Sequence, residues 1–135
     1  MEAPVTESLP KGIDLGIVVT DGDAAVRFYT EVLGLKLEGS NPAGDATMYR
    51  VSCGTSQLKL IAPNTTPTAL PKAELFGMVG YRYLTITVDD VDAMVAVCEA
   101  AGHPVVIPSR DLGPVRIVMV EDPDGNRVEF LRLPS

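Results

Sequence analysis

One carboxylate in this chain stands in a pattern that could support chemistry, at Glu129 near the C-terminus. It follows an Asp-Pro-Asp-Gly-Asn stretch at residues 122–126, in which Pro fixes one backbone φ and the Asp, Gly and Asn residues tolerate a turn. Apolar Val128 and Phe130 alternate with Glu129, which predicts a strand with the carboxylate on the face opposite the apolar one. A carboxylate on such a face could accept a proton from a substrate or bind a hard cation.

A second candidate group consists of Tyr83, Thr85 and Thr87, which alternate with apolar residues over positions 82–88. The alternation predicts a strand with these three side chains on one face. Hydroxyl groups in a packed core would need hydrogen-bond partners, so small polar residues in this pattern are typical of a sheet face that lines a cavity.

The elements that must position these residues occur twice along the chain. Residues 13–19 alternate as a strand, residues 20–23 offer oxygens that can cap a helix, and apolar residues then recur at helical spacing until Gly34. Strands are predicted at 35–38, 47–53 and 57–61. After a Pro- and Thr-rich stretch, the pattern restarts with a strand at 82–88 and a helix ending at Gly102, followed by strands at 105–107, 115–120 and 127–131.

The register of this repeat can be tested with residue numbers alone. Asp21 and Asp90, at the two helix starts, are 69 positions apart. When the two copies are aligned with this offset, the apolar residues of 15–19 match apolar residues of 84–88. An offset of 70 places Leu58 on Val128. Two copies of one β-α-β-β-β unit, each too small to bury its own apolar face, are expected to share a core.

The first unit also contains Asp21, an Arg-Phe-Tyr stretch at 27–29 and a Val-Leu-Gly-Leu stretch at 32–35. Together with the turn at 122–126 and Glu129, this pattern resembles the glyoxalase/bleomycin-resistance/dioxygenase superfamily, also called the vicinal oxygen chelate superfamily, over residues 13–133. The resemblance implies an α+β fold in which two tandem βαβββ modules form a curved, partly open mixed sheet around a cavity. The family includes metal-dependent lyases, isomerases, epimerases and ring-cleaving dioxygenases as well as metal-free proteins that sequester drugs.

The expected organisation is a flexible N-terminus at residues 1–11 and a single domain at 12–135. Within that domain, module 1 would cover about residues 12–63 and module 2 about residues 81–133. The linker between them, residues 64–80, contains several Pro and Thr residues and is expected to include a short helix around 72–76.

Metal-dependent members of the family place one ligand on the first strand and one on the last strand of each module, typically His and Glu. The matching positions here are Asp14, Lys59, Tyr83 and Glu129. Only Glu129 keeps the expected ligand type, because a charged Lys has no lone pair to offer and Tyr rarely binds such a metal. We therefore expect no metal cofactor, with one divalent metal as the alternative. A Lys59 ammonium between Asp14 and Glu129 would place a positive charge about where relatives hold their metal.

Each position also has a purely structural interpretation. Lys59 could point to solvent, as most lysines do, and Asp14 could cap a turn at the start of its strand. Tyr81 and Tyr83 could be aromatic walls only. In the functional interpretation, Tyr81, Thr85 and Thr87 contact a substrate.

Three classes of function fit these residues. In the first, a metal-independent isomerase, lyase or cyclase uses Glu129 or Asp14 to take a proton next to a carbonyl, Lys59 to stabilise the oxyanion and Tyr83 to donate a proton. In the second, the protein binds a drug or antibiotic without catalysis. In the third, it is a metal-dependent glyoxalase-like lyase or dioxygenase. The chain is 5% aromatic and contains no Trp, which leaves little for a stacking binder, so we rank the first class ahead.

Composition limits the partners. The formal net charge is -7 and no Lys/Arg cluster occurs, which argues against nucleic acid and anionic membrane surfaces. No apolar run reaches membrane length, and a cytoplasmic location is expected. Partners are expected to be a small-molecule ligand and, as among the relatives, a second copy in a homodimer. Cys53 and Cys98 are predicted to be buried free thiols, and His103, in a loop, a surface residue rather than a ligand.

Overall fold

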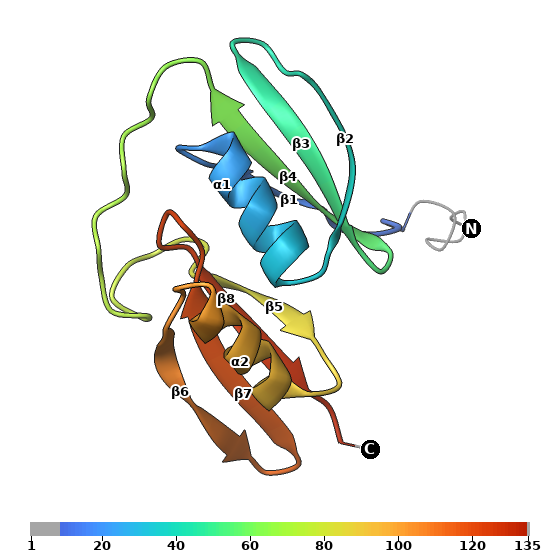
Figure 1. The fold of residues 1–135 in the computed structure, drawn as a ribbon, viewed down its shortest axis with the longest axis vertical. Coiled ribbons are helices and arrows are strands. Elements are labelled where there is room, and N and C mark those ends of the chain that lie inside the picture. The colour runs from blue at the N-terminus through green and yellow to red at the C-terminus, as the bar shows by residue number, and fades with distance from the viewer. Residues whose placement is uncertain (1–8, 135) are drawn as a thin grey trace, which may run out of the picture.

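A computed structural model of the protein describes residues 9–134, so most of the expected flexible segment at residues 1–11 lies outside the described residues. The elements follow the predicted order in two similar sets (Figure 1). The first set comprises β1 (Leu15–Val18), α1 (Gly22–Arg27), the π-helical turn η2 (Phe28–Val32), β2 (Lys36–Pro42), β3 (Ala46–Cys53) and β4 (Ser56–Pro63). The second set comprises β5 (Tyr83–Thr87), α2 (Val91–Ala100), β6 (Val105–Leu112), β7 (Val115–Glu121) and β8 (Arg127–Arg132).

Each set forms one four-stranded mixed sheet, in the strand orders β1-β4-β3-β2 and β5-β8-β7-β6. The first and last strands of each set are parallel neighbours, and the other pairs are antiparallel. Leu15 pairs with Leu58 in the first sheet, and Leu84 pairs with Val128 in the second, so the sequence offsets of 69 and 70 recur as spatial register. The prediction of two tandem βαβββ modules in an α+β fold is confirmed.

Both helical segments begin as predicted. Asp21 accepts a hydrogen bond from the Ala24 N–H at 3.1 Å, and Asp90 accepts one from the Ala93 N–H at 3.0 Å. These side chains satisfy backbone donors that have no partner within the helix. Within residues 9–134, no helix is long and apolar enough to cross a membrane.

Four elements differ from the prediction. The first helix changes at Phe28 into a π-helical turn, in which the Leu33 N–H donates to the Phe28 carbonyl at 3.0 Å. Strands β2 and β6 are longer than predicted, because each continues along its antiparallel neighbour. The expected helix at 72–76 is wrong, since the carbonyls of Glu74 and Leu75 accept hydrogen bonds from the Arg82 guanidinium and the Glu74 carbonyl also closes a turn.

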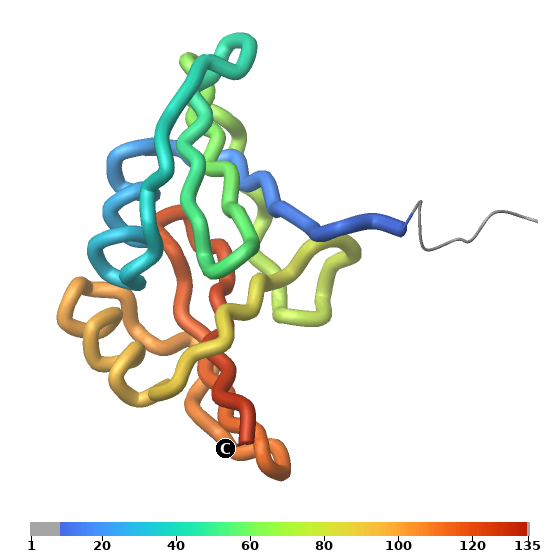
Figure 2. Tube along the Cα trace, turned by 90° about the vertical axis from the view of Figure 1, so that its right-hand side faces the viewer, coloured from blue at the N-terminus to red at the C-terminus, as the bar shows by residue number. Residues whose placement is uncertain are grey.

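Helices α1 and α2 lie on the same side of the two sheets and bury one shared core (Figures 1 and 2). Phe28, Leu60 and Phe130 are among its fully buried side chains. Cys98 is also fully buried, and desolvation, with a smaller contribution from Glu99, raises the pKa of its thiol to about 11. Cys53 is half-buried, and both cysteines are free thiols.

The turn at 122–126 joins the two modules. The Tyr29 hydroxyl, fully buried in module 1, donates to Asp122 Oδ2 at 2.8 Å, and Asp122 is itself 4% exposed. Asp122 also accepts from the Asp124 N–H and from two N–H groups of Asn126, while Asp124 Oδ2 accepts from the Thr20 N–H at 3.0 Å. Burial, and next the Asp122 carboxylate, raise the pKa of Tyr29 well above its usual range. The turn therefore serves as a buried polar contact between modules.

Candidate functional site

We call the face of each sheet that is turned away from α1 and α2 its inner face. Leu58 and Leu60 in β4, and Val128 and Phe130 in β8, point into the core below the helices. Strand side chains alternate between faces, so Lys59 and Glu129 lie on the inner faces of their sheets. In Figure 2 both helices lie on one side of the sheets, and the linker and the segment before β1 lie on the other.

Glu129 is an almost fully buried carboxylate. It is 7% exposed, and its cross-strand neighbour Met119 is buried as well. On its other side Thr85 is its paired residue in β5, and the Thr85 hydroxyl donates to Glu129 Oε1 at 2.9 Å. Oε2 makes no hydrogen bond to any residue between 9 and 134. A shielded carboxylate with one oxygen held and the other free is suited to accepting a proton.

Two arginines of module 2 donate hydrogen bonds to backbone carbonyls of the linker. The Arg127 guanidinium donates to the Ala73 carbonyl at 3.0 Å. The Arg82 guanidinium donates to the carbonyls of Leu75 and Glu74 at 2.9 and 3.1 Å. Arg127 precedes Glu129 by two residues in β8, so it lies on the same inner face. The linker thus lies beside the face that presents Glu129 (Figure 2).

Lys59 has a different environment from the one expected. Its Nζ atom lies 4.0 Å from Asp14 Oδ2, and the two side chains are 41% and 43% exposed. Asp14 Oδ1 also accepts from the Gln57 N–H at 3.1 Å, which is the turn-capping role considered for it. In the described part of the chain, no ion pair joins Lys59 to Glu129. The expected grouping of three charges is therefore wrong within one chain, because Lys59 and Glu129 belong to sheets that share no strand pairing.

The other expected site residues are spread along the same side of module 2. Tyr83 is 46% exposed and shares the inner face with Thr85 and Thr87. Tyr81 precedes β5 and is 94% exposed. The structure thus brings Thr85 to Glu129, and leaves the two tyrosines largely open to solvent.

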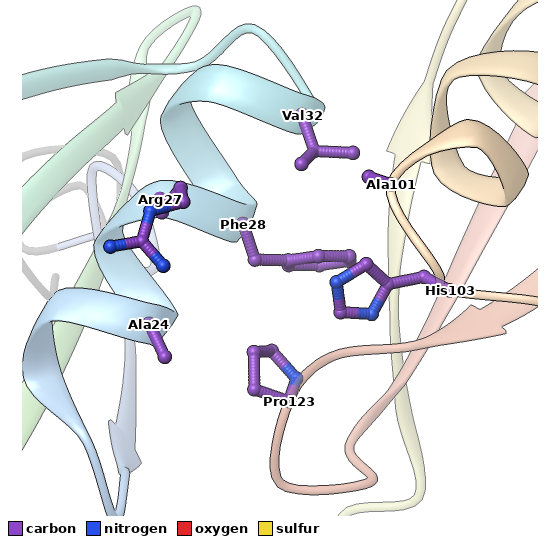
Figure 3. A pocket seen from close by; sticks show the side chains of 7 residues that line it. All are labelled: Ala24, Arg27, Phe28, Val32, Ala101, His103 and Pro123. Atoms are coloured by element: carbon purple, nitrogen blue, oxygen red, sulfur yellow. The ribbon is translucent and has the colours of Figure 1, made fainter.

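A hollow of about 280 Å³ lies on the opposite, helix side of the molecule, between α1 and the loops after α2 and β7 (Figure 3). None of the expected site residues line it. Its lining residues are Ala24, Arg27, Phe28, Val32, Ala101, His103 and Pro123. The prediction of His103 as a surface residue is wrong, since its ring is half-buried with its centroid 4.6 Å from that of Phe28. His103 packs at the module junction.

Residues 9–134 offer no set of ligands that fits a divalent metal. Over residues 9–134, no group of three or more His, Cys, Asp or Glu side chains is close enough to hold one. At the expected ligand positions Lys59 would repel a cation, and Asp14 already accepts a backbone hydrogen bond. No chemical step is therefore assigned to a metal.

Sequence reasoning missed one inner-face residue, Arg50. It pairs directly with Lys59 across β3 and β4. The short turn between Cys53 and Ser56 could have revealed this pairing, because a tight hairpin fixes which residues stand opposite each other.

Two mixed sheets, each with a helix over one face, define a two-module class of α+β proteins. Residues 13–130 match the family model described as Glyoxalase/Bleomycin resistance protein/Dioxygenase superfamily. The chain belongs to this superfamily.

Relatives and solved structures agree with this assignment. The chain is 31% identical over 124 residues to the lactoylglutathione lyase of Haemophilus influenzae, across 87% of this chain and 88% of that protein. It is 32% identical over 120 residues to a probable chloroplastic lactoylglutathione lyase of Arabidopsis thaliana, but spans only 33% of that protein's length. A glyoxalase family protein from Bacillus cereus shares the fold, with a TM-score of 0.84 at 22% identity over 98% of this chain and all of the other. An antibiotic binding protein from Streptomyces sp. CB03234 has a TM-score of 0.71 at 26% identity over 93% of this chain and 98% of the other.

Proposed function

We propose that this protein is a glyoxalase-like enzyme of the lyase or isomerase type, which acts on a small organic molecule by acid-base catalysis without a bound metal. The observation that carries this proposal is the environment of Glu129. Its carboxylate is almost completely shielded on an inner face, one oxygen is held by Thr85, and the other is free. Buried carboxylates of this kind are suited to act as general bases.

The proposed step is a proton transfer beside a carbonyl group. Glu129 Oε2 takes the proton from the hydroxyl-bearing carbon next to the carbonyl. The electron pair of that C–H bond forms a C=C bond, and the π electron pair of the carbonyl group moves onto its oxygen. The Lys59 ammonium stabilises the oxyanion. The protonated Glu129 then returns the proton to the former carbonyl carbon, directly or through the Tyr83 hydroxyl. The hydroxyl group on the first carbon passes its proton to the oxyanion and becomes the new carbonyl, while Tyr81, Thr85 and Thr87 contact the substrate.

We further propose that two copies form a homodimer that brings a module 1 inner face against a module 2 inner face. Lys59 and Glu129 belong to different sheets, so the proposed step needs a second inner face nearby. Large apolar side chains that are almost fully exposed support this proposal; they are Ile13, Phe76, Val79 and Tyr81. Sedimentation equilibrium should give twice the mass of the chain, and a monomer at all concentrations would contradict the proposal.

The proton transfer can be tested by NMR in D2O. Candidate substrates are lactoylglutathione, the compound in the name of the Haemophilus relative, and small hydroxycarbonyl compounds. The parent should exchange the hydrogen next to the carbonyl for deuterium, and Glu129→Gln should slow the exchange by about 10²-fold or more. The control is Glu99→Gln, an exposed carboxylate on α2, which should leave the rate unchanged. Equal rates in the parent and Glu129→Gln would refute the role of Glu129.

A second candidate function is binding of a drug or antibiotic without catalysis. The likeness to the antibiotic binding protein from Streptomyces favours it. If the protein is such a binder, it should bind an aromatic antibiotic stoichiometrically and should catalyse no hydrogen–deuterium exchange in any candidate substrate. Glu129→Gln should then bind the antibiotic with the same affinity as the parent.

We also propose a cytoplasmic location. The two free thiols, Cys53 and Cys98, support it, since disulfides are rare in reducing compartments. Recovery in the cytosolic fraction of the source cells is the expected result.

A further inference from the structure

A row of four paired residues crosses the inner face of module 1. Gly16 in β1 pairs with Lys59 in β4, Lys59 pairs with Arg50 in β3, and Arg50 pairs with Gly39 in β2. Two cationic side chains therefore stand directly opposite each other, with a glycine at either end of the row.

Both cations point to the inner face. Val51 and Leu58, which follow Arg50 and precede Lys59, are buried in the core below the helices. Because side chains alternate along a strand, Arg50 and Lys59 point the other way, and both are half-buried. The equivalent row in module 2 consists of Thr85, Glu129, Met119 and Ile107. That row has no cation, so the fold itself does not require the pair.

The charge of the pair is poorly compensated by the chain. Like charges directly opposite in a sheet destabilise it. Asp14 lies 4.0 Å from Lys59, at the limit of an ion pair. The Arg50 guanidinium makes one hydrogen bond, from Nε to Asn41 Oδ1 at 3.3 Å, and no ion pair with any residue from 9 to 134. Lys59 thus has one carboxylate at 4.0 Å and Arg50 has no ion pair within residues 9–134, in a protein whose net charge is -7, and the terminal nitrogens of Arg50 remain available.

The flanking glycines leave space around the pair. A Cβ atom at Gly39 would lie 2.6 Å from Arg50 Nη2, so the guanidinium lies directly over the Gly39 backbone. Gly16 presents no side chain beside Lys59. In this row the two cations are therefore the only side chains on the inner face of module 1.

We infer that Arg50 and Lys59 together bind an oxyanion group, a carboxylate or a phosphate, of a small molecule. Arg offers a planar fork of donors that matches either group, and Lys adds a point charge. The assignment of this group to the substrate rests on the proposed function, whereas the binding site itself does not. The substrate class is then an anionic carbonyl compound, with its charged group on module 1.

The test is an NMR titration of the ¹⁵N-labelled full chain at low ionic strength, with inorganic phosphate and, separately, with malonate. Amide shifts should concentrate around Gly16, Gly39, Arg50 and Lys59. Arg50→Gln and Lys59→Gln should each weaken binding about tenfold, the effect expected for loss of a charged hydrogen bond. Whichever of phosphate or malonate binds more tightly identifies the group as phosphate or carboxylate.

The matched control is Lys36→Gln, which removes an exposed cation from β2 of the same sheet and should change affinity by less than about twofold. Arg50→Lys keeps the charge without the fork and should be intermediate. The absence of binding by the parent, or an equal loss in Lys36→Gln and Arg50→Gln, would overturn the inference. Turnover in Glu129→Gln tests the proposed function, whereas phosphate affinity in Arg50→Gln tests this inference, so the two ideas can fail separately.

Discussion

Replacing Tyr29 by Phe tests the polar contact between the modules. The variant removes one hydroxyl, which donates to Asp122 Oδ2 at 2.8 Å where both residues are buried. A hydrogen bond to a charged group contributes about 1.5–3 kcal/mol. Asp122 keeps three N–H donors from the turn at 122–126, so it is not left without partners. We therefore expect Tyr29→Phe to lower the free energy of unfolding by about 1.5–2 kcal/mol at pH 7.

Urea denaturation measures this loss, with Tyr49→Phe as the control. Tyr49 is half-buried, and its hydroxyl makes no hydrogen bond to a residue in the described range. Its replacement should change the free energy of unfolding by less than about 0.5 kcal/mol.

The stability of the parent and of Tyr29→Phe should also depend differently on pH. Burial and Asp122 raise the pKa of Tyr29 in the folded state, whereas an unfolded Tyr titrates near 10. Below pH 10 both states keep the proton, and above it only the folded state does. The free energy of unfolding of the parent should therefore fall by about 1.4 kcal/mol per pH unit above pH 10 through this residue, a loss that Tyr29→Phe lacks. The reasoning would be refuted if Tyr29→Phe lost no more free energy of unfolding at pH 7 than Tyr49→Phe. It would also be refuted if the free energies of unfolding of the parent and of Tyr29→Phe changed in parallel from pH 9 to 11.

Three further predictions concern single sites. Lys59→Met should change the free energy of unfolding by less than about 1 kcal/mol, because the Lys59–Asp14 pair is about two-fifths exposed. Thermal melts at pH 5 and pH 8 should show the same small change. A loss of several kcal/mol would instead show a buried charge network. Gly22→Ala should cost about 1–3 kcal/mol in urea denaturation, since its Cβ would lie 2.7 Å from Tyr49 Cε2, whereas Gly12→Ala, with nothing within 4 Å, should be neutral. Elemental analysis of dialysed protein should find no stoichiometric zinc, nickel, manganese or iron, and one equivalent per chain would favour the metal-dependent class.

Much of the fold could be predicted because its signals are local. Strand alternation and helical spacing place the elements to within a few residues, and Asp21 and Asp90 cap their helices as predicted. The offsets of 69 and 70 predicted that Leu15 is equivalent to Leu84 and Leu58 to Val128, and the structure agrees, since Leu15 pairs with Leu58 in one module and Leu84 with Val128 in the other. The linker helix was wrong because its carbonyls bond to Arg82, a side chain whose position depends on tertiary structure.

The candidate site shows where local reasoning ends. Alternation alone predicts that Glu129 lies on the face opposite the apolar one, whereas for Lys59 the sequence left solvent and the cavity as alternatives. Whether Lys59 meets Asp14, Glu129 or solvent depends on how the two sheets lie relative to each other, and the sequence pattern contains no information on that distance. The same holds for His103 against Phe28 and for Tyr29 against Asp122, contacts between residues 75 and 93 positions apart. The sequence by itself determined the two modules, the register of their repeat and the face of Glu129, since these follow from short-range periodicity. Only the tertiary structure decided which charged groups meet, because that depends on the packing of one module against the other.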